Sequence, residues 1–307
     1  MARGVRFPGP VVEDVLDLVG GTPLVRLSRV SPAGGGVVWG KLESHNVAGS
    51  VKDRPALAMV ESAEASGALA KGGTIVEATS GNTGISLAMI AAVRGYRCVL
   101  VMPDDMSLER RYILRAYGAE VVLTPALEGM HGAVQRAKSL VSTTAGAWMP
   151  KQFENPENPS AHARTTAEEL LEQTGGDIAA FVAGVGTGGT LTGVGRVLRE
   201  RLGEAVVIVA VEPQGSAVIS GGPPGLHGIQ GLGAGFVPAI LDRSLITRVV
   251  TVGDVVAERM ASRLAREEGL MVGPSAGANV HAAAEIAKTV SGRVVTILCD
   301  SGERYLF

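Results

Sequence analysis

The stretch TIVEATSGNTG, residues 74–84, joins a strand pattern to the start of a helix. Its first five residues are rich in β-branched and apolar side chains, which favour a strand. Polar residues and glycines follow, and a helical pattern then continues to about Val93. The same strand–loop–helix order recurs along much of the chain. Strands that alternate with helices of this length predict an α/β fold with mainly parallel sheets covered by helices.

Two series of such units lie before and after residue 150, which predicts two three-layer α/β domains with the active site in the cleft between them. A polar, proline-bearing stretch at 154–160 is interpreted as a linker or exposed loop, and 213–238 as an irregular segment. Strands are expected at 24–27, 37–42, 74–78, 97–102, 120–123, 148–153, 179–183, 206–212, 248–252 and 293–299. Helices are expected at 11–19, about 52–65, 82–93, 107–117, 131–142, 161–173, 191–202, 254–268 and 278–290.

Composition excludes several classes of protein. The 307 residues are 46% apolar but only 4% aromatic, so the core is expected to be aliphatic. The net charge of −2, with no basic stretch, argues against nucleic-acid binding. No apolar run reaches the roughly 18 residues of a membrane helix, and no secretory signal core is recognisable. Cys98 and Cys299 have no metal-ligand spacing, so we expect a cytoplasmic protein without a structural metal.

Lys52 stands at the start of an expected helix, after a polar, turn-like stretch at 43–49. Ser50 is interpreted as the N-cap of this helix and Asp53 as its capping-box partner. The helix dipole disfavours a cation in the first turn, so a neutral amine is better tolerated there. Lys52 is therefore a candidate Schiff-base lysine, which must lose its proton to attack a carbonyl carbon. The alternative is a surface lysine on a helix shoulder.

Three loops follow strands and open helices, where open α/β sheets bind ligands. The loop GVGTGGT at 184–190 offers backbone N–H groups and hydroxyls at a helix N-terminus, as a phosphate cradle does. It lacks the Walker lysine, and its partial match to the dinucleotide fingerprint is weak. The loop at 79–84 suits a carboxylate. Ser275 lies on an expected tight turn at 273–277. The alternative for the loop at 184–190 is a turn that serves only packing. The alternative for the loop at 79–84, and for Ser275, is an N-cap of the following helix.

Nucleophilic and metal-dependent hydrolysis are not supported. Ser80 lacks the Gly-x-Ser-x-Gly elbow of serine hydrolases. The five histidines include no pair at the i, i+4 spacing of a helical metal site.

Five motifs occur together and in order: GGTPLVRL at 20–27, GSVKDR at 49–54, EATSGNTG at 77–84, GTGGT at 186–190 and GPSAG at 273–277. In these motifs the chain resembles the fold-type II pyridoxal-phosphate enzymes, and within them it is similar to the cysteine synthase (O-acetylserine sulfhydrylase) family. The resemblance covers nearly the whole chain. It implies a smaller, mobile domain at 43–150 and a larger, cofactor-anchoring domain formed by 1–42 and 151–307.

The resemblance also implies roles for individual residues. Lys52 is the catalytic lysine that binds pyridoxal 5′-phosphate. The other cofactor-binding residues are Asn82 at the 3′-oxygen, Gly186, Thr187, Gly188, Gly189 and Thr190 at the phosphate, and Ser275 at the pyridine nitrogen. The substrate-binding residues are Thr79, Ser80, Gly81, Thr83 and Gln152 at the α-carboxylate and Gly231 near the substrate side chain.

The activity that the resemblance implies is β-replacement, which converts O-acetyl-L-serine and sulfide to L-cysteine and acetate through an α-aminoacrylate. Cystathionine β-synthase-type replacement, dehydration of serine or threonine, and the use of O-phosphoserine or thiosulfate stay open, as does the A-type or B-type isozyme class. A homodimer is implied, and serine acetyltransferase is a candidate partner. From other classes, a Rossmann dehydrogenase and a non-catalytic partner domain are the alternatives.

Overall fold

The structure, a computed structural model, describes residues 11–306, and its larger sheet has six strands in the order β1-β2-β10-β7-β8-β9. Only β1 is antiparallel to its neighbour; the other four pairings are parallel. The strands are β1 (Leu24–Arg26), β2 (Val37–Leu42), β7 (Ala180–Gly184), β8 (Val207–Pro213), β9 (Arg248–Val252) and β10 (Arg293–Leu298). The sheet thus joins an early segment of the chain to its last strand.

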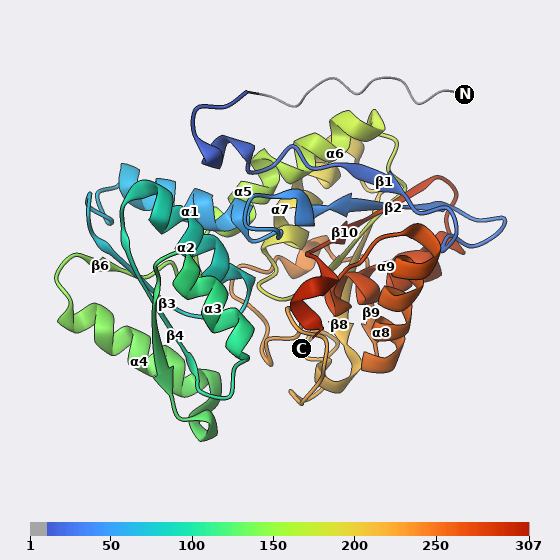
Figure 1. The fold of residues 1–307 in the computed structure, drawn as a ribbon. Coiled ribbons are helices and arrows are strands. Elements are labelled where there is room, and N and C mark those ends of the chain that lie inside the picture. The colour runs from blue at the N-terminus through green and yellow to red at the C-terminus, as the bar shows by residue number, and fades with distance from the viewer. Residues whose placement is uncertain (1–10, 307) are drawn as a thin grey trace.

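The smaller sheet has four parallel strands in the order β5-β4-β3-β6. They are β3 (Thr74–Ala78), β4 (Arg97–Pro103), β5 (Glu120–Thr124) and β6 (Ala147–Trp148). Figure 1 shows the two sheets side by side, each with its own helices. The prediction of an α/β fold with mainly parallel sheets is confirmed.

Helices cover both faces of each sheet. Buried residues of α1, α2 and α3 pack on one face of the smaller sheet, and α4 packs on the other. On the larger sheet, α8 and α9 cover one face, and α6 and α7 the other. The helices are α1 (Asp53–Ala65), α2 (Asn82–Arg94), α3 (Leu108–Ala116), α4 (Gly129–Thr143), α5 (Glu157–Arg164), α6 (Thr166–Thr174), α7 (Gly189–Leu202), α8 (Asp254–Arg263) and α9 (Pro274–Ala287).

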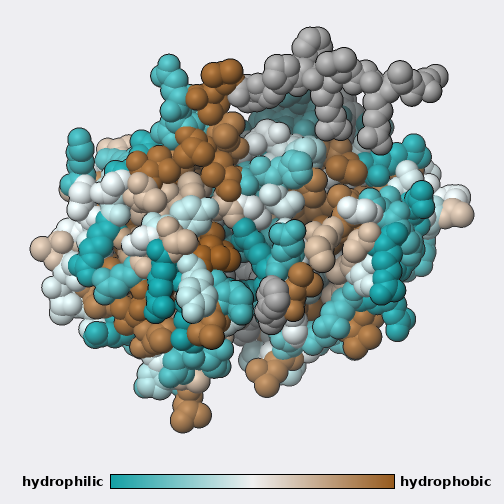
Figure 2. All heavy atoms as spheres, viewed as in Figure 1, coloured by the Kyte–Doolittle hydropathy of each residue, from teal (hydrophilic) through white to brown (hydrophobic). Residues whose placement is uncertain are grey.

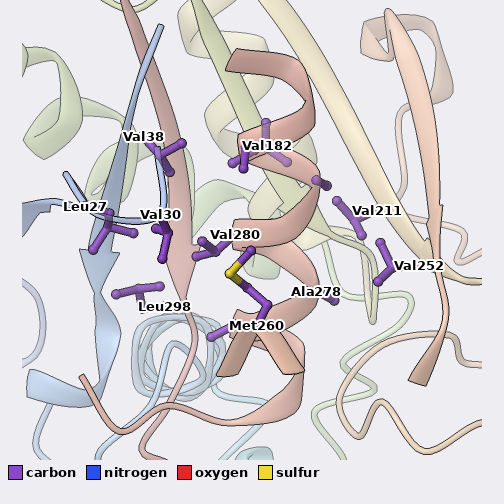
Figure 3. Close-up of a cluster of buried hydrophobic side chains, with 14 of the residues drawn as sticks. Leu27, Val30, Val38, Val182, Val211, Val252, Met260, Ala278, Val280 and Leu298 are labelled. Atoms are coloured by element: carbon purple, nitrogen blue, oxygen red, sulfur yellow. The ribbon is translucent and has the colours of Figure 1, made fainter. Parts of the chain in front are cut away.

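The core of the larger sheet follows the period of two that a strand imposes on its side chains. Along β10, Val294 packs toward α8 and α9, whereas Val295 packs toward α6 and α7. Figure 3 shows Val182, Val211 and Val280 among the buried side chains on the first of these faces. Because both faces are covered, the central strands read as nearly continuous apolar runs.

The structure corrects several expected elements. The segment expected as a helix at 11–19 contains a short 3₁₀ turn, Val15–Leu18. The strand expected at 148–153 is only the two-residue β6, Ala147–Trp148, and a strand could not continue through Lys151, whose φ is +53°. The helix expected at 161–173 is interrupted at Thr165, between α5 and α6. The helix expected at 254–268 ends in a π-helical turn, Leu264–Glu268.

Two expected loops are helical. The stretch at 154–160, interpreted as a linker, contains the first half of α5, in which Asn158 and Pro159 are buried. The turn expected at 273–277 is the first turn of α9, which begins at Pro274. Proline is well tolerated there because the first helical N–H groups have no partner within the helix.

On the face in Figure 2, hydrophilic and hydrophobic side chains are interspersed. Within residues 11–306, no helix combines the length and the apolar character that crossing a bilayer requires.

Candidate active site

A cavity of about 880 Å³ lies where the two sheets and their loops meet. Its walls come from the loops after β3 and β7, from the segments before α1 and after β6, and from the first turn of α9. The predicted site residues that line it are Lys52, Thr79, Ser80, Gly81, Asn82, Thr83, Gln152, Gly186, Thr187, Gly188, Thr190, Gly231 and Ser275. Gly189 is the one predicted site residue outside the lining. The fold therefore brings together positions that lie far apart in the sequence.

Lys52 is half-buried and immediately precedes α1. Its side chain forms no ion pair within the part of the chain that the structure describes. Its backbone N–H donates to the Ser50 hydroxyl at 3.2 Å. The predicted capping box is wrong: α1 begins at Asp53, its N-cap is Lys52 rather than Ser50, and no side chain caps it. The Asp53 carboxylate accepts from Ala48 N at 2.6 Å and from the Ser86 hydroxyl at 2.5 Å.

Burial raises the pKa of Asp53 to about 6, and its two hydrogen bonds oppose that rise. Through these two bonds the carboxylate ties the loop before Lys52 to α2. Asp53 thus fixes the backbone that carries Lys52 rather than capping its helix.

The loop after β3 forms one wall of the cavity and leads into α2. The Thr83 hydroxyl donates to Gln152 Oε1 at 2.7 Å, which joins this loop to the segment after β6. Gly81 N donates to the Thr79 hydroxyl at 3.3 Å. Hydroxyls, an amide and the N–H groups at the start of α2 are suited to hold a carboxylate.

The loop after β7 forms another part of the cavity wall and leads into α7. Gly188 precedes the helix with a φ of +84°, a conformation that favours glycine. A Cβ added to Gly186 would lie 2.2 Å from the Gly231 carbonyl oxygen, so only glycine fits this approach. The loop thus presents backbone donors and threonine hydroxyls at the positive end of a 14-residue helix. This arrangement fits a phosphate group.

Two residues that support this loop were not identified from the sequence. Asn158 Nδ2 donates to the Thr187 hydroxyl at 3.0 Å and to the Gln152 carbonyl at 2.8 Å. His162 Nε2 lies 3.2 Å from the Thr190 hydroxyl. Burial, with the charges of Arg54 and Lys52, holds the pKa of His162 well below its ordinary value, so the ring is neutral. Neither residue has a local sequence signal, because both act across a helix contact.

Ser275 is buried in the first turn of α9, beside Cys299. Burial raises the pKa of the Cys299 thiol to about 11, so the thiol stays protonated at neutral pH. One turn along, Asn279 donates to the Ile297 carbonyl at 2.9 Å, while its side-chain oxygen is buried without a protein partner. This wall therefore presents polar groups, and Asp300 continues it next to Cys299.

A buried ionic cluster supports α1 from behind. Arg54 contacts Glu43 at 2.7 Å and Glu169 at 2.6 Å, and Lys41 contacts Glu169 at 2.6 Å. Burial alone would raise the pKa of Glu169, but the hydrogen bonds and charges of Arg54 and Lys41 lower it to about 2. The cluster joins α1 and α6 to the larger sheet.

Comparison with known proteins agrees with this geometry. The family model "Pyridoxal-phosphate dependent enzyme" matches residues 15–300. A cysteine synthase of Staphylococcus aureus is 51% identical over 298 residues, which cover 96% of each protein. The crystal structure of an O-ureido-L-serine synthase is 48% identical, with a TM-score of 0.93 over 97% of this chain and 94% of that one. The cysteine synthase of Entamoeba histolytica is 38% identical, with a TM-score of 0.94 over 99% and 93% of the two chains.

The chain belongs to the family of pyridoxal-phosphate dependent enzymes. The cavity residues fit this cofactor, because a phosphate cradle and a half-buried lysine line the same space. Within the family, the chain is similar over nearly its whole length to cysteine synthases.

Proposed function

We propose that this protein is a cysteine synthase, which forms L-cysteine and acetate from O-acetyl-L-serine and sulfide. One observation carries the proposal: a single cavity is lined by Lys52, by the carboxylate-type loop Thr79–Thr83 and by the phosphate-type loop at 186–190, of which only Gly189 lies outside the lining. Identity of 51% with a cysteine synthase over 96% of both proteins supports it.

In this proposal Lys52 binds the cofactor, and the backbone N–H groups and threonine hydroxyls of Gly186–Thr190 hold its phosphate. Asn82 serves the 3′-oxygen and Ser275 the pyridine nitrogen. Bound pyridoxal phosphate supplies the electron sink for chemistry at the substrate Cα and Cβ. Ser275 is a weaker partner for a ring nitrogen than a carboxylate, which favours elimination over a long-lived carbanion.

Lys52 then carries the proton. Its amine takes the proton from the substrate Cα as acetate departs from Cβ, and returns it to Cα after sulfide has bonded to Cβ. Lys52 is half-buried and lines the cavity, which supports this role. Thr79, Ser80, Gly81, Thr83 and Gln152 orient the substrate through its α-carboxylate, and Gly231 lies toward its side chain.

The division into a mobile domain at 43–150 and a larger domain at 1–42 and 151–307 is part of the proposal. The two separate sheets support it, since β2 ends at Leu42 in the larger sheet and the smaller sheet ends at β6 (Ala147–Trp148). A homodimer, a complex with serine acetyltransferase and a cytoplasmic location are also proposed, on the resemblance to cysteine synthases alone.

Substitution of Lys52 tests the function directly. Purified protein with pyridoxal phosphate should show a visible band that changes when O-acetylserine is added without sulfide and recovers when sulfide follows. Lys52→Ala should lose cysteine formation by about 10³-fold or more, as expected when a catalytic nucleophile is removed. Lys71→Ala, an exposed lysine, is the matched control and should retain activity. A parent protein that gains no visible band would refute the proposal.

Formation of O-ureido-L-serine is the second candidate, because a solved O-ureido-L-serine synthase is 48% identical with a TM-score of 0.93. The two activities differ in the nucleophile that bonds to the substrate Cβ. Mass spectrometry of products with O-acetylserine and either sulfide or hydroxyurea distinguishes them by their relative kcat/KM. Homocysteine as a third nucleophile tests for cystathionine formation.

A further inference from the structure

The C-terminal segment Asp300–Tyr305 reaches across the molecule to Asn82. The Arg304 guanidinium donates through Nη1 to Asn82 Oδ1, and Asn82 Nδ2 donates to Asp300 Oδ2 at 2.6 Å. Asn82 begins α2 on the smaller sheet, whereas Asp300 follows the last strand of the larger sheet. Figure 1 shows this end of the chain near the middle of the molecule.

These two partners determine which way the Asn82 amide faces. A guanidinium only donates hydrogen bonds, and an ionised carboxylate only accepts them. A flipped amide would turn its N–H groups toward Arg304 and its oxygen toward Asp300, and both bonds would be lost. The observed orientation leaves the second N–H of Asn82 Nδ2 without a protein partner in residues 11–306. That N–H is available to an acceptor in the cavity.

The same guanidinium also holds the loop that leads to Lys52. Arg304 Nη2 donates to the Ala48 carbonyl. A Cβ on Gly49 would lie 2.6 Å from Arg304 Nη2, so glycine at this position leaves the space that the guanidinium needs. Beside it, Val51 N donates to the Cys299 carbonyl at 2.9 Å, and Ser50 pairs with Asp300 in an antiparallel bridge. Arg304 therefore links the Lys52 loop and Asn82 through one rigid, planar group.

We propose that Arg304 is a positioning residue for the cofactor: it sets the orientation of the Asn82 amide and the placement of Asn82 relative to the Lys52 loop. This inference rests on the proposed function, in which Asn82 and Lys52 both serve pyridoxal phosphate. The turn Gly302–Tyr305 contains no predicted site residue, and the inference gives it a role in positioning Asn82.

The test is a double-mutant cycle read by cofactor binding. Apoprotein of the parent, Arg304→Met, Asn82→Ala and the double variant is titrated with pyridoxal phosphate, and affinity and absorption maximum are recorded. Arg304→Met should weaken affinity by about 10- to 100-fold, as expected for a lost hydrogen bond from a charged group, and should shift the absorption maximum or its pH dependence. In the Asn82→Ala background, Arg304→Met should weaken the affinity for pyridoxal phosphate by less than about threefold, because its partner Asn82 is already absent.

Two further variants separate positioning from folding. Arg304→Lys keeps the charge and one donor direction, and should recover part of the affinity. Glu303→Gln, an exposed neighbour in the same turn, should bind cofactor like the parent. An Arg304→Met protein with a lower melting temperature but parental affinity and spectrum would overturn the inference, as would full additivity in the double variant. Failure of the parent itself to bind pyridoxal phosphate would instead refute the proposed function, and this inference with it.

Discussion

Glu77 is a buried carboxyl group whose ionisation opposes folding. It is 3% exposed, and it accepts from Ala78 N at 2.9 Å and from Lys151 N at 3.0 Å. Burial raises its pKa to about 7, although these backbone donors favour the charged form. An unfolded glutamate titrates near pH 4.3, roughly. Between these two values the folded state holds a proton that the unfolded state has released, so stability falls as pH rises through this window.

Glu77→Gln should remove this pH dependence. The free energy of unfolding of the parent should decrease relative to that of the variant between pH 5 and pH 8, by at most about 3 kcal/mol for a shift of this size. Urea denaturation of both proteins at several pH values measures the difference. If the free energies of unfolding of the two proteins changed in parallel with pH, the pKa of Glu77 would not be raised in the folded state. Asp53, with a pKa near 6, is present in both proteins and cancels.

Also at the residue scale, the sequence predicted which residues line the cavity better than it predicted the residues that support them. Lys52, the Thr79–Thr83 loop and the Gly186–Thr190 loop carry local signals, because each is a run of polar or glycine residues at a helix start. His162 and Arg304 carry none. Their roles arise from contacts across 28 and 222 positions of sequence, which no local pattern encodes.

The first half of helix α5 was not predicted from the sequence. Prolines and asparagines at 154–160 favour loops locally, and eight residues are too few to show a helical period. Burial against α7 overrides that local preference: Asn158 lies so close to Gly189 that an added Cβ would be 1.9 Å from its Oδ1. Gly189 is therefore needed for helix contact, although it does not line the cavity.

Gly189→Ala should separate α5 from α7 and disturb the phosphate loop. Asn158 would have to move, and its hydrogen bonds to Thr187 and Gln152 would weaken. We expect affinity for pyridoxal phosphate to fall by about tenfold or more, since two buried hydrogen bonds are affected. Gly195→Ala in the same helix is the control, because its Cβ would meet Ile208 at 3.4 Å. Equal cofactor affinities in a titration of the two variants would contradict the role of this contact.

Helix α6 contributes Glu169, the carboxylate shared by two buried cations. Glu169→Gln would leave Arg54 and Lys41 with less compensation in a poorly solvated place. Removing one partner of a buried ion pair typically lowers the free energy of unfolding by about 3–5 kcal/mol. Because Glu169 is partly exposed, we expect a decrease near the lower limit of this range. Glu168→Gln breaks only an exposed contact to Arg201 and should cost little. Chemical denaturation at pH 7 compares the two variants. Similar midpoints would show that the buried ionic cluster contributes no more to stability than the exposed contact does.

For the molecule as a whole, strand and helix order were predictable because each buried strand is a nearly continuous apolar run bounded by loops. The pairing of β2 with β10 was not, since it brings residues 37–42 beside 293–298 through contacts of long sequence separation. That pairing places the Lys52 loop next to the C-terminal segment, and hence creates the wall where Arg304 meets Asn82.

Arg110 on α3 joins residues from different parts of the cavity wall. Its guanidinium donates to the Ser80 carbonyl at 3.0 Å and to Gln230 on the larger-sheet side, and it lies 5.8 Å from the centre of the Tyr305 ring. Closing an active site excludes water from reactive intermediates. We therefore expect these contacts to favour the closed arrangement during turnover.

Arg110→Ala should shift the balance toward the open arrangement by about tenfold, the equivalent of about 1.4 kcal/mol for hydrogen bonds of this kind. Water should then compete better with sulfide, and pyruvate released per cysteine formed should rise, while affinity for pyridoxal phosphate changes little. Arg115→Ala, an exposed residue on the same helix, is the matched control. Gln230→Ala should reproduce part of the effect, because it removes the partner on the opposite side. An unchanged pyruvate-to-cysteine ratio in Arg110→Ala would show that closure depends on other contacts, with the carboxylate loop Thr79–Thr83 next to be tested.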